Sequence, residues 1–306
     1  MSIYTVTLNS AVDITVGEYL YKKEGVLPTN SKMIPAGKGI NVSRALSCVG
    51  VCSTAIAIIG ARDLEFFMSI KNDRITPAFV LAEGETRKNL TITNCEDEKE
   101  RHEKHGGFTI GLQQVEEIKE ILIEKVVEGD IVAFCGSLPN GANLNLYREL
   151  ILLTRKLGAY PLLDTSNEEL LEGIAASPYM IKPNEYELKY LARETLENFE
   201  REEDAMRQIC CEYDINYMLL SEGENGARLY SYEEDKMLEM EAIPALHKIV
   251  STVGCGDSMV AGFIYGLINH LSAEDMLTEA MKFANANLYT EVPCDLEKFG
   301  LNGGDL

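Results

Sequence analysis

A glycine-rich turn that runs directly into a helical pattern carries the most informative chemistry of the chain. Residues 251–263 read STVGCGDSMVAGF, and apolar residues recur at helical spacing after Asp257. Gly254 and Gly256 let backbone N–H groups turn towards one point, and a helix start adds further unpaired N–H groups. Such a turn attracts an anion, and the carboxylate beside it can take a proton from an attacking hydroxyl. The same residues also fit an ordinary N-cap of a buried helix.

A second glycine turn places a cation at another helix start. Gly37, Lys38 and Gly39 precede a helical pattern at 40–49. The turn is not a Walker A loop, because Gly39 stands where Ser or Thr would coordinate magnesium. Asp13 follows the first strand-like segment and Arg87 begins a later one. Taken singly, Asp13 fits a turn-former equally well, and Arg87 fits a solvated edge charge better than a ligand-binding residue.

Two further motifs follow strand-like segments in the second half of the chain. Ser221, Gly223 and Gly226 form a loop in which a backbone can approach a nucleotide closely, and the pattern equally fits a hairpin turn. Asn184 and Glu187 lie one helical turn apart, so both can face one point. Their oxygens suit Mg²⁺ that keeps most of its waters, and they also match a helix capping box.

The elements that must position these residues alternate regularly from about residue 113 onward. Strands are expected at 3–8, 54–59, 130–135, 160–165, 179–181 and 217–220, with helices at 113–127, 144–157, 201–213 and 273–289. This order predicts an α/β fold, a mostly parallel sheet whose strand carboxyl ends gather the candidate loops at one edge.

Two early β-rich segments do not fit this alternation. Residues of about 12–34 and 77–110 are predicted to form a small β-sheet lid, inserted in a single domain of residues 1–306. Within the first segment, short strands broken at Pro28 are expected. A charged loop is expected at 96–105.

Composition excludes several classes of partner. Twenty-eight Lys and Arg residues against 49 Asp and Glu give a net charge of −21, which argues against nucleic acid or an anionic membrane surface. No apolar run reaches the length of a membrane span, and the chain begins with a strand-like segment rather than a signal peptide. Eight cysteines without a C-x-x-C pair predict reduced thiols and a cytoplasmic protein.

The motifs, taken in order, resemble the ribokinase-like (PfkB) carbohydrate kinases over nearly the whole chain. The similarity is greatest to the branch that contains 1-phosphofructokinases and tagatose-6-phosphate kinases. The matching segments are YTVTLN (4–9) with Asp13, GKGINVSR (37–44), TRKN (86–89), GSLP (136–139), LDTS (163–166), IKPNE (181–185), SEGENGA (221–227) and TVGCGDSMVAGF (252–263).

The resemblance implies a three-layer α/β/α sandwich that phosphorylates a sugar phosphate, of fructose 1-phosphate or tagatose 6-phosphate type, with ATP and Mg²⁺. Asp257 would be the general base, with the N–H groups of Gly254, Cys255, Gly256 and Asp257 as the anion hole. Substrate-binding roles would fall to Asp13, Gly37, Lys38, Gly39, Asn41, Arg87, Asn89 and Ser137. Nucleotide-binding roles would fall to Lys182, Asn184, Ser221, Gly223, Gly226, Thr252 and Asn285. Asn184 and Glu187 would hold Mg²⁺ through water, and a homodimer through the lid sheet is implied.

Some positions depart from the branch and keep other functions open. Ser10 stands where Pro is usual, Ala36 replaces a glycine, and Thr91 stands where a phosphate-binding Lys is common. Arg62 is a hypothetical replacement for that charge. The alternatives are a kinase of a non-phosphorylated sugar or nucleoside, and a catalytically silent regulator that binds a sugar phosphate.

Overall fold

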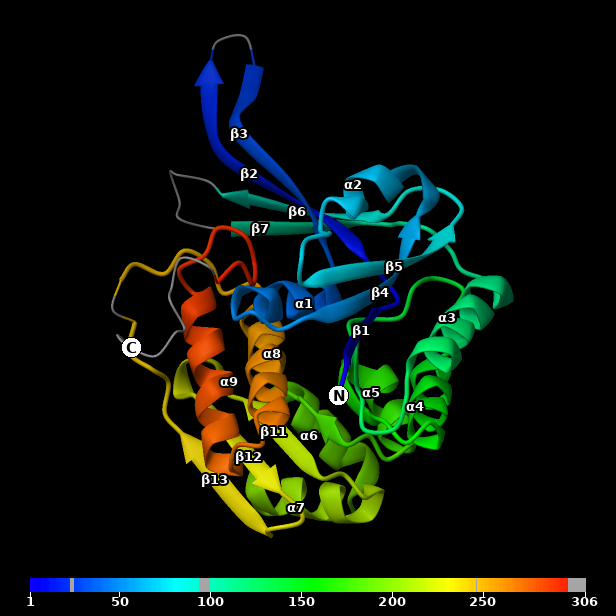
Figure 1. The fold of residues 1–306 in the computed structure, drawn as a ribbon. Coiled ribbons are helices and arrows are strands. Elements are labelled where there is room, and N and C mark those ends of the chain that lie inside the picture. Colours follow the sequence, from blue (N-terminus) through cyan, green and yellow to red (C-terminus); the bar gives the residue numbers. More distant parts are fainter. Residues whose placement is uncertain (23–24, 94–99, 246, 297–306) are drawn as a thin grey trace.

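The computed structural model describes residues 1–22, 25–93, 100–245 and 247–296, and Figure 1 shows its ribbon. A nine-stranded sheet forms the centre of this part of the chain. Its strands are β1 (Ile3–Thr7), β4 (Ser53–Gly60), β5 (Ile75–Ala82), β8 (Ile131–Cys135), β9 (Tyr160–Asp164), β10 (Met180–Ile181), β11 (Tyr217–Ser221), β12 (Ala227–Ser231) and β13 (Lys236–Met240).

The order across this sheet is β13-β12-β11-β10-β9-β8-β1-β4-β5. All pairs from β5 to β11 are parallel, and only β12 and β13 join in antiparallel fashion. The carboxyl ends of the parallel strands therefore meet at one edge of the sheet, where the loops that follow them can build a common site.

Helices cover both faces of the sheet. They are α1 (Lys38–Cys48), α2 (Leu64–Met68), α3 (Leu112–Lys125), α4 (Leu146–Lys156), α5 (Asn167–Ile174), α6 (Glu185–Thr195), α7 (Glu202–Tyr213), α8 (Cys255–Ile268) and α9 (Ala273–Asn287). One hydrophobic core packs α3 to α7 on one face, and a second packs α1, α8 and α9 on the other. The predicted three-layer α/β/α sandwich is thus confirmed.

Helix α8 is buried on nearly all sides because small residues let its neighbour approach. A Cβ on Gly262 would lie 2.5 Å from the carbonyl oxygen of Glu279 on α9, and one on Gly266 would lie 2.7 Å from Cγ of Met276. The two helices therefore pack almost backbone to backbone, which fixes the position of the α8 start at the sheet edge.

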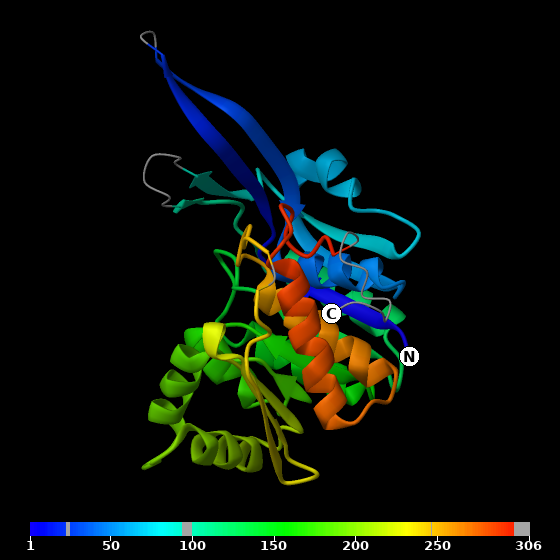
Figure 2. The same cartoon turned by 90° about the vertical axis from the view of Figure 1, so that its left-hand side faces the viewer.

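A second, four-stranded sheet stands at one end of the molecule. Its order is β3-β2-β6-β7, from β2 (Ala11–Lys22), β3 (Gly25–Ala36), β6 (Arg87–Thr93) and β7 (Glu100–His105). Figure 2 shows that the β2–β3 hairpin projects well beyond the body of the molecule.

Three expectations about this region need correction, and the first two concern residues 77–81 and Pro28. Residues 77–81 do not belong to the small sheet, since β5 pairs in parallel with β4 at the edge of the large one. The short helix α2, which was not predicted, supplies the crossover between those two strands. Pro28 does not break its strand, because it pairs with Tyr19 from an edge strand, where a missing N–H is tolerated.

The third correction concerns the charged segment 96–105. Residues 100–105 form the strand β7, in antiparallel register with β6. The remainder of the predicted loop, 96–99, lies outside the described residues, as do Cys95 and residues 297–306 of the predicted domain.

Candidate active site

The start of α8 brings a carboxylate and a helix N-terminus together at the sheet edge. Gly254 is the N-cap residue, and its φ of 91° lies in the left-handed region that favours glycine. The N–H of Cys255 donates to the carbonyl of Thr252 at 3.3 Å. The first-turn N–H groups of Gly256 and Asp257 have no intrahelical partner by helix geometry, so they are available to donate to an anion.

Asp257 lies in the first turn of α8 and is 6% exposed. Burial raises the pKa of its carboxyl group to about 6. The nearby carboxylate of Asp164 also raises this pKa, whereas the cations of Lys38 and Lys182 and a hydrogen bond from Asn41 lower it. A carboxylate with a pKa near neutrality is ionised at pH 7 and can still accept a proton, as a general base must.

The second glycine turn lies beside this carboxylate. Gly37 is the N-cap residue of α1, and a Cβ on Gly39 would lie 2.6 Å from Oγ1 of Thr7, so α1 starts against the end of β1. From this helix the Asn41 side chain donates to Asp257 Oδ2 at 2.8 Å. The structure therefore brings together the two glycine turns, which are more than 200 residues apart in sequence.

A buried carboxylate that we did not predict as a site residue joins two predicted lysines. Asp164 Oδ1, at the end of β9, lies 3.1 Å from Lys38 Nζ and 3.3 Å from Lys182 Nζ. Burial alone would raise the pKa of Asp164, but the two lysines hold it below its usual value. Burial would likewise lower the pKa of Lys38, but Asp164 and Asp257 hold it well above the usual value. The LDTS motif was the available signal for Asp164.

Predicted substrate residues lie where the small sheet meets the large one. Asn89 on β6 donates to Asp13 Oδ1 on β2 at 2.7 Å, because these residues face each other in the parallel register. Burial raises the pKa of Asp13, against the effects of Asn89 and Arg87. Nε of Arg87 donates to the carbonyl of Ser10 at 3.3 Å, and this guanidinium is half-buried.

Hydrogen bonds from two sides fix the loop after β8, which carries Ser137. Asn9, after β1, donates to Ser137 Oγ at 3.1 Å and to the Leu138 carbonyl at 3.0 Å. Glu169 on α5 accepts the N–H of Leu138 at 3.1 Å. Asn9 and Glu169 were not predicted as site residues, although Asn9 closes the YTVTLN motif.

A cavity of about 810 Å³ opens beside the α8 turn, within the roughly 300–1,000 Å³ range of ligand pockets. Among the residues that line it are the predicted nucleotide-binding residues Asn184, Ser221, Gly223, Gly226, Thr252 and Asn285, together with Cys255 and Gly256 of the turn. Asn285 is 5% exposed, and neither its Nδ2 nor its Oδ1 has a hydrogen-bond partner. Lys182 does not line the cavity, but its Nζ lies 3.3 Å from the position of a Cβ on Gly256.

Asn184 and Glu187 form the capping box of α6. The Asn184 side chain accepts the N–H of Glu187 at 2.9 Å, and Glu187 Oε2 accepts the N–H of Asn184 at 2.8 Å. This arrangement still fits a Mg²⁺ ion held through water, because Asn184 borders the cavity and Glu187 Oε1 is not used by the capping box. Burial raises the pKa of Glu187, and a bound divalent cation would lower it again.

A cluster of three carboxylates beside the cavity does not suit a metal. Glu185, Glu202 and Glu222 offer oxygens within 4.8 Å of one another. Arg228, however, forms short ion pairs with Glu202 and Glu222, and Lys189 lies 3.2 Å from Glu202. Two of the three carboxylates are therefore already paired with cations, which leaves little charge to attract a metal ion.

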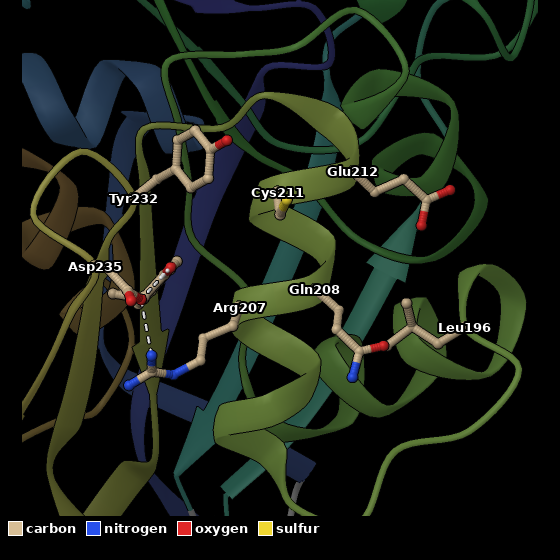
Figure 3. A pocket seen from close by; sticks show the side chains of 8 residues that line it. Leu196, Arg207, Gln208, Cys211, Glu212, Tyr232 and Asp235 are labelled. Carbon is tan, nitrogen blue, oxygen red and sulfur yellow. Dashed lines mark hydrogen bonds and ion pairs between the residues drawn. The ribbon is translucent and has the colours of Figure 1, made fainter.

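A second hollow of about 550 Å³ lies beside α7, away from the predicted site, and Figure 3 shows its lining. None of the predicted site residues lines it. Its arginine, Arg207, is already paired with Asp235 at 2.8 Å. The hollow is also not built from the carboxyl ends of the parallel strands, so it is a poor candidate for the active site.

Comparison with known proteins agrees with this geometry. The family model described as pfkB family carbohydrate kinase matches residues 6–291. The chain belongs to this family of carbohydrate kinases. The family that the motifs predicted is thus confirmed, and with it the prediction of an enzyme of this class.

Two curated relatives and one solved structure illustrate how similar the chain is to known members of this family. A tagatose-6-phosphate kinase of Staphylococcus epidermidis is 33% identical over 93% of this chain and 91% of its own length. A 1-phosphofructokinase of Haemophilus influenzae is 33% identical over 93% and 89%, respectively. Phosphofructokinase-2 of Escherichia coli, solved in complex with substrates and products, superposes with a TM-score of 0.84 at 27% identity, covering 94% of each chain.

In the described part of the chain, no helix is long and apolar enough to cross a membrane.

Proposed function

We propose that this carbohydrate kinase transfers the γ-phosphoryl group of ATP to a sugar phosphate and so forms a bisphosphate. One observation carries the proposal: Asp257 lies where the cavity beside α8 adjoins the α1 turn with its lysine. The two curated relatives named above act on phosphorylated ketohexoses by name, which supports an acceptor of fructose 1-phosphate or tagatose 6-phosphate type.

In the proposed reaction, the ionised carboxylate of Asp257 accepts the proton of the acceptor hydroxyl as its oxygen attacks the γ-phosphorus. The N–H groups of the α8 turn stabilise the charge on the moving phosphoryl group. Lys38 and Lys182 lie on either side of Asp164 and supply positive charge between the acceptor and nucleotide sides. Arg87 and Ser137 are proposed to bind the acceptor phosphate, with Asp13, Asn41 and Asn89 at its hydroxyls.

The nucleotide is proposed to occupy the cavity beside α8, with Ser221, Gly223 and Gly226 along one wall. The free amide of Asn285 would bind its base. Mg²⁺ would be held through water by Asn184 and Glu187, where it would neutralise phosphate charge and orient the phosphates.

A panel of acceptors, assayed by ADP release, tests the proposal. Fructose 1-phosphate, fructose 6-phosphate and tagatose 6-phosphate are compared with free fructose, ribose and adenosine. Turnover with a sugar phosphate, lost by several orders of magnitude in Asp257→Asn with acceptor binding retained, is the expected result. Comparable turnover in that variant would refute the assigned base.

Two features favour an acceptor without a phosphate as the second candidate. Thr91 replaces a usual lysine, and the exposed Arg62 is paired with Glu85 at 3.4 Å instead of standing free for a phosphate. Higher kcat/KM with free sugars or nucleosides than with sugar phosphates would select this alternative. Binding of a sugar phosphate without ADP release from any acceptor would select the silent regulator.

We also propose that the enzyme is a cytoplasmic homodimer. The projecting β2–β3 hairpin offers a surface through which two small sheets could join. The seven cysteines that the structure describes are all free, as a reducing compartment requires. Sedimentation of the chain, with and without a β2–β3 deletion, tests the dimer.

A further inference from the structure

Arg44 on α1 is a half-buried arginine whose assigned partners are all neutral oxygens. One terminal nitrogen donates to Asn41 Oδ1 at 2.8 Å and to the carbonyl of Pro293 at 3.0 Å. The other donates to the carbonyl of Pro35 at 2.7 Å. Burial lowers the pKa of this guanidinium. A charge kept largely out of water without a carboxylate in contact is costly, so its position calls for an explanation.

The contact with Asn41 has a directional consequence. A guanidinium can only donate hydrogen bonds, so the atom of Asn41 that faces Arg44 must be the amide oxygen. The amide nitrogen is then turned the other way, where it donates to Asp257 Oδ2 at 2.8 Å. A reversed amide would place an oxygen lone pair against the Asp257 carboxylate, which is tolerable only if that carboxyl group is protonated.

The same arginine also connects to the turn before Asp257 through the segment 290–294. Asn287 is fully buried; its Oδ1 accepts the N–H of Cys294 at 2.7 Å, and its Nδ2 donates to the carbonyl of Val253 at 2.8 Å. Because Arg44 binds the carbonyl of Pro293, it is tied to both sides of the α8 start, to Asp257 through Asn41 and to the turn through Asn287.

We propose that Arg44 is a positioning residue that fixes the orientation of the Asn41 amide and so keeps Asp257 ionised as the base. The inference rests on the proposed function for its catalytic meaning. Its physical content, the orientation of one amide and its effect on one carboxyl group, can be measured without turnover.

Other groups also act on Asp257 and must be separated from this effect. The charged and titratable groups that interact with it are Lys38 of α1, Asp164 of β9, Lys182 after β10, Cys135 of β8, and Cys255 and Cys294 at the two sides of the turn. None of these groups is removed when Arg44 is changed, so the double-mutant cycle below is needed to assign a shift in Arg44→Met to the amide that Arg44 holds.

The experiment follows the titration of Asp257 by NMR in protein labelled at the aspartate carboxyl carbon, with the resonance assigned by its loss in Asp257→Asn. Arg44→Met should raise the pKa of Asp257 by about 1 unit, because the hydrogen bond to the ionised form is lost. Arg155→Met is the matched control. Arg155 also donates to two backbone carbonyls, those of Ala176 and Ser177, but it lies on α4 and should leave both the titration and the activity unchanged.

A double-mutant cycle separates the amide from a through-space effect. Asn41→Leu should raise the pKa of Asp257, and Arg44→Met added to it should raise it no further. An equal rise in both backgrounds would mean that Arg44 acts through its charge alone, and no rise in Arg44→Met would mean that it does not orient the amide; either result overturns the proposal.

Asn41→Asp keeps the proposal testable if Arg44→Met does not fold. This isosteric change keeps a hydrogen-bond acceptor for Arg44, so the protein should still fold. It also presents an oxygen to Asp257, and the pair should titrate with one pKa raised by about 1 unit or more. An unchanged titration would show that the amide nitrogen does not face Asp257, and the proposal would fail. In active variants, the acid limb of kcat/KM should move with the NMR titration while the KM for ATP stays constant.

Discussion

Lys38 and Lys182 share a single carboxylate oxygen, Asp164 Oδ1, at 3.1 and 3.3 Å. The first lysine begins α1, on the proposed acceptor side, and the second follows β10, on the proposed nucleotide side. Both the carboxylate and the Lys182 side chain are almost fully buried. One buried anion therefore sets the spacing of two cations that the proposed reaction needs on opposite sides of the moving group.

Replacing this anion should damage both stability and catalysis. We expect Asp164→Asn to lower the free energy of unfolding by roughly 3 kcal/mol, at the low end for a broken buried pair because the Lys38 side chain is 41% exposed. We expect kcat to fall roughly 10²-fold. Urea denaturation and steady-state kinetics measure the two effects.

Asp130→Asn is the matched control for that change. Asp130 is equally buried, but it accepts the backbone N–H groups of Ser2 and Val127 before β8, at the opposite edge of the sheet. The Asp130→Asn protein should therefore be less stable than the wild type but keep its kcat. Equal losses of kcat in both variants would contradict a specific role of Asp164.

Activity should depend on pH through Asp257. The base works when ionised, and its pKa of about 6 means that activity is full above this pH and is lost as the pH falls through it. Below that point kcat/KM should fall about tenfold per pH unit. Lys38→Met should move this limb to higher pH and Asp164→Asn to lower pH, since these charges act on Asp257 in opposite directions. A profile that stays flat well below pH 6 would rule out this base.

Two asparagines on α9, two positions apart, should respond in opposite ways to the same change. Asn285→Leu removes an amide that has no partner, so stability without nucleotide should be unchanged or higher, while the KM for ATP rises about tenfold. Asn287→Leu removes a fully bonded amide and should cost about 1–3 kcal/mol. Thermal denaturation and ATP titration separate them; a comparable loss of stability in both would contradict the assignment of Asn285 to the ligand.

The glycines of the loop after β11 give a second matched pair. A Cβ on Gly226, at φ 110°, would lie 2.1 Å from the Met240 carbonyl, whereas one on Gly223, at φ 58°, would meet nothing within 4 Å. Gly226→Ala should cost roughly 3 kcal/mol and raise the KM for ATP, and Gly223→Ala about 1 kcal/mol. Urea denaturation of the two proteins measures the difference, and similar values would contradict the close approach.

The sequence predicted most of the large sheet because its strands are apolar runs separated by helices of regular period. It assigned β5 to the wrong sheet, because the crossover helix α2 that leads to β5 has five residues, too few to show a helical period. It also failed at Pro28, because whether a proline breaks a strand depends on the strand being at an edge, and that is a property of the assembled sheet.

Sequence motifs identified the loops of the site but not the contacts between them. The pairing of Asp13 with Asn89 follows from the parallel register of β2 and β6, although the two residues are 76 positions apart in the sequence. The bridge through Asp164 depends on the ends of β9 and β10 meeting the start of α1, which follows a strand of the other sheet. Such contacts are set by tertiary packing, which a local pattern does not encode.

The long β2–β3 hairpin has a mechanical consequence. Asp13 and Ala36 lie at its base, next to the proposed acceptor site, while its other end projects away from the body of the molecule (Figure 1). The two strands pair along nearly their whole length, so a displacement of the outer part of the hairpin would be passed along the paired strands to the backbone of Asp13. If Asp13 binds the acceptor as proposed, a molecule that binds the outer hairpin would therefore also alter acceptor binding.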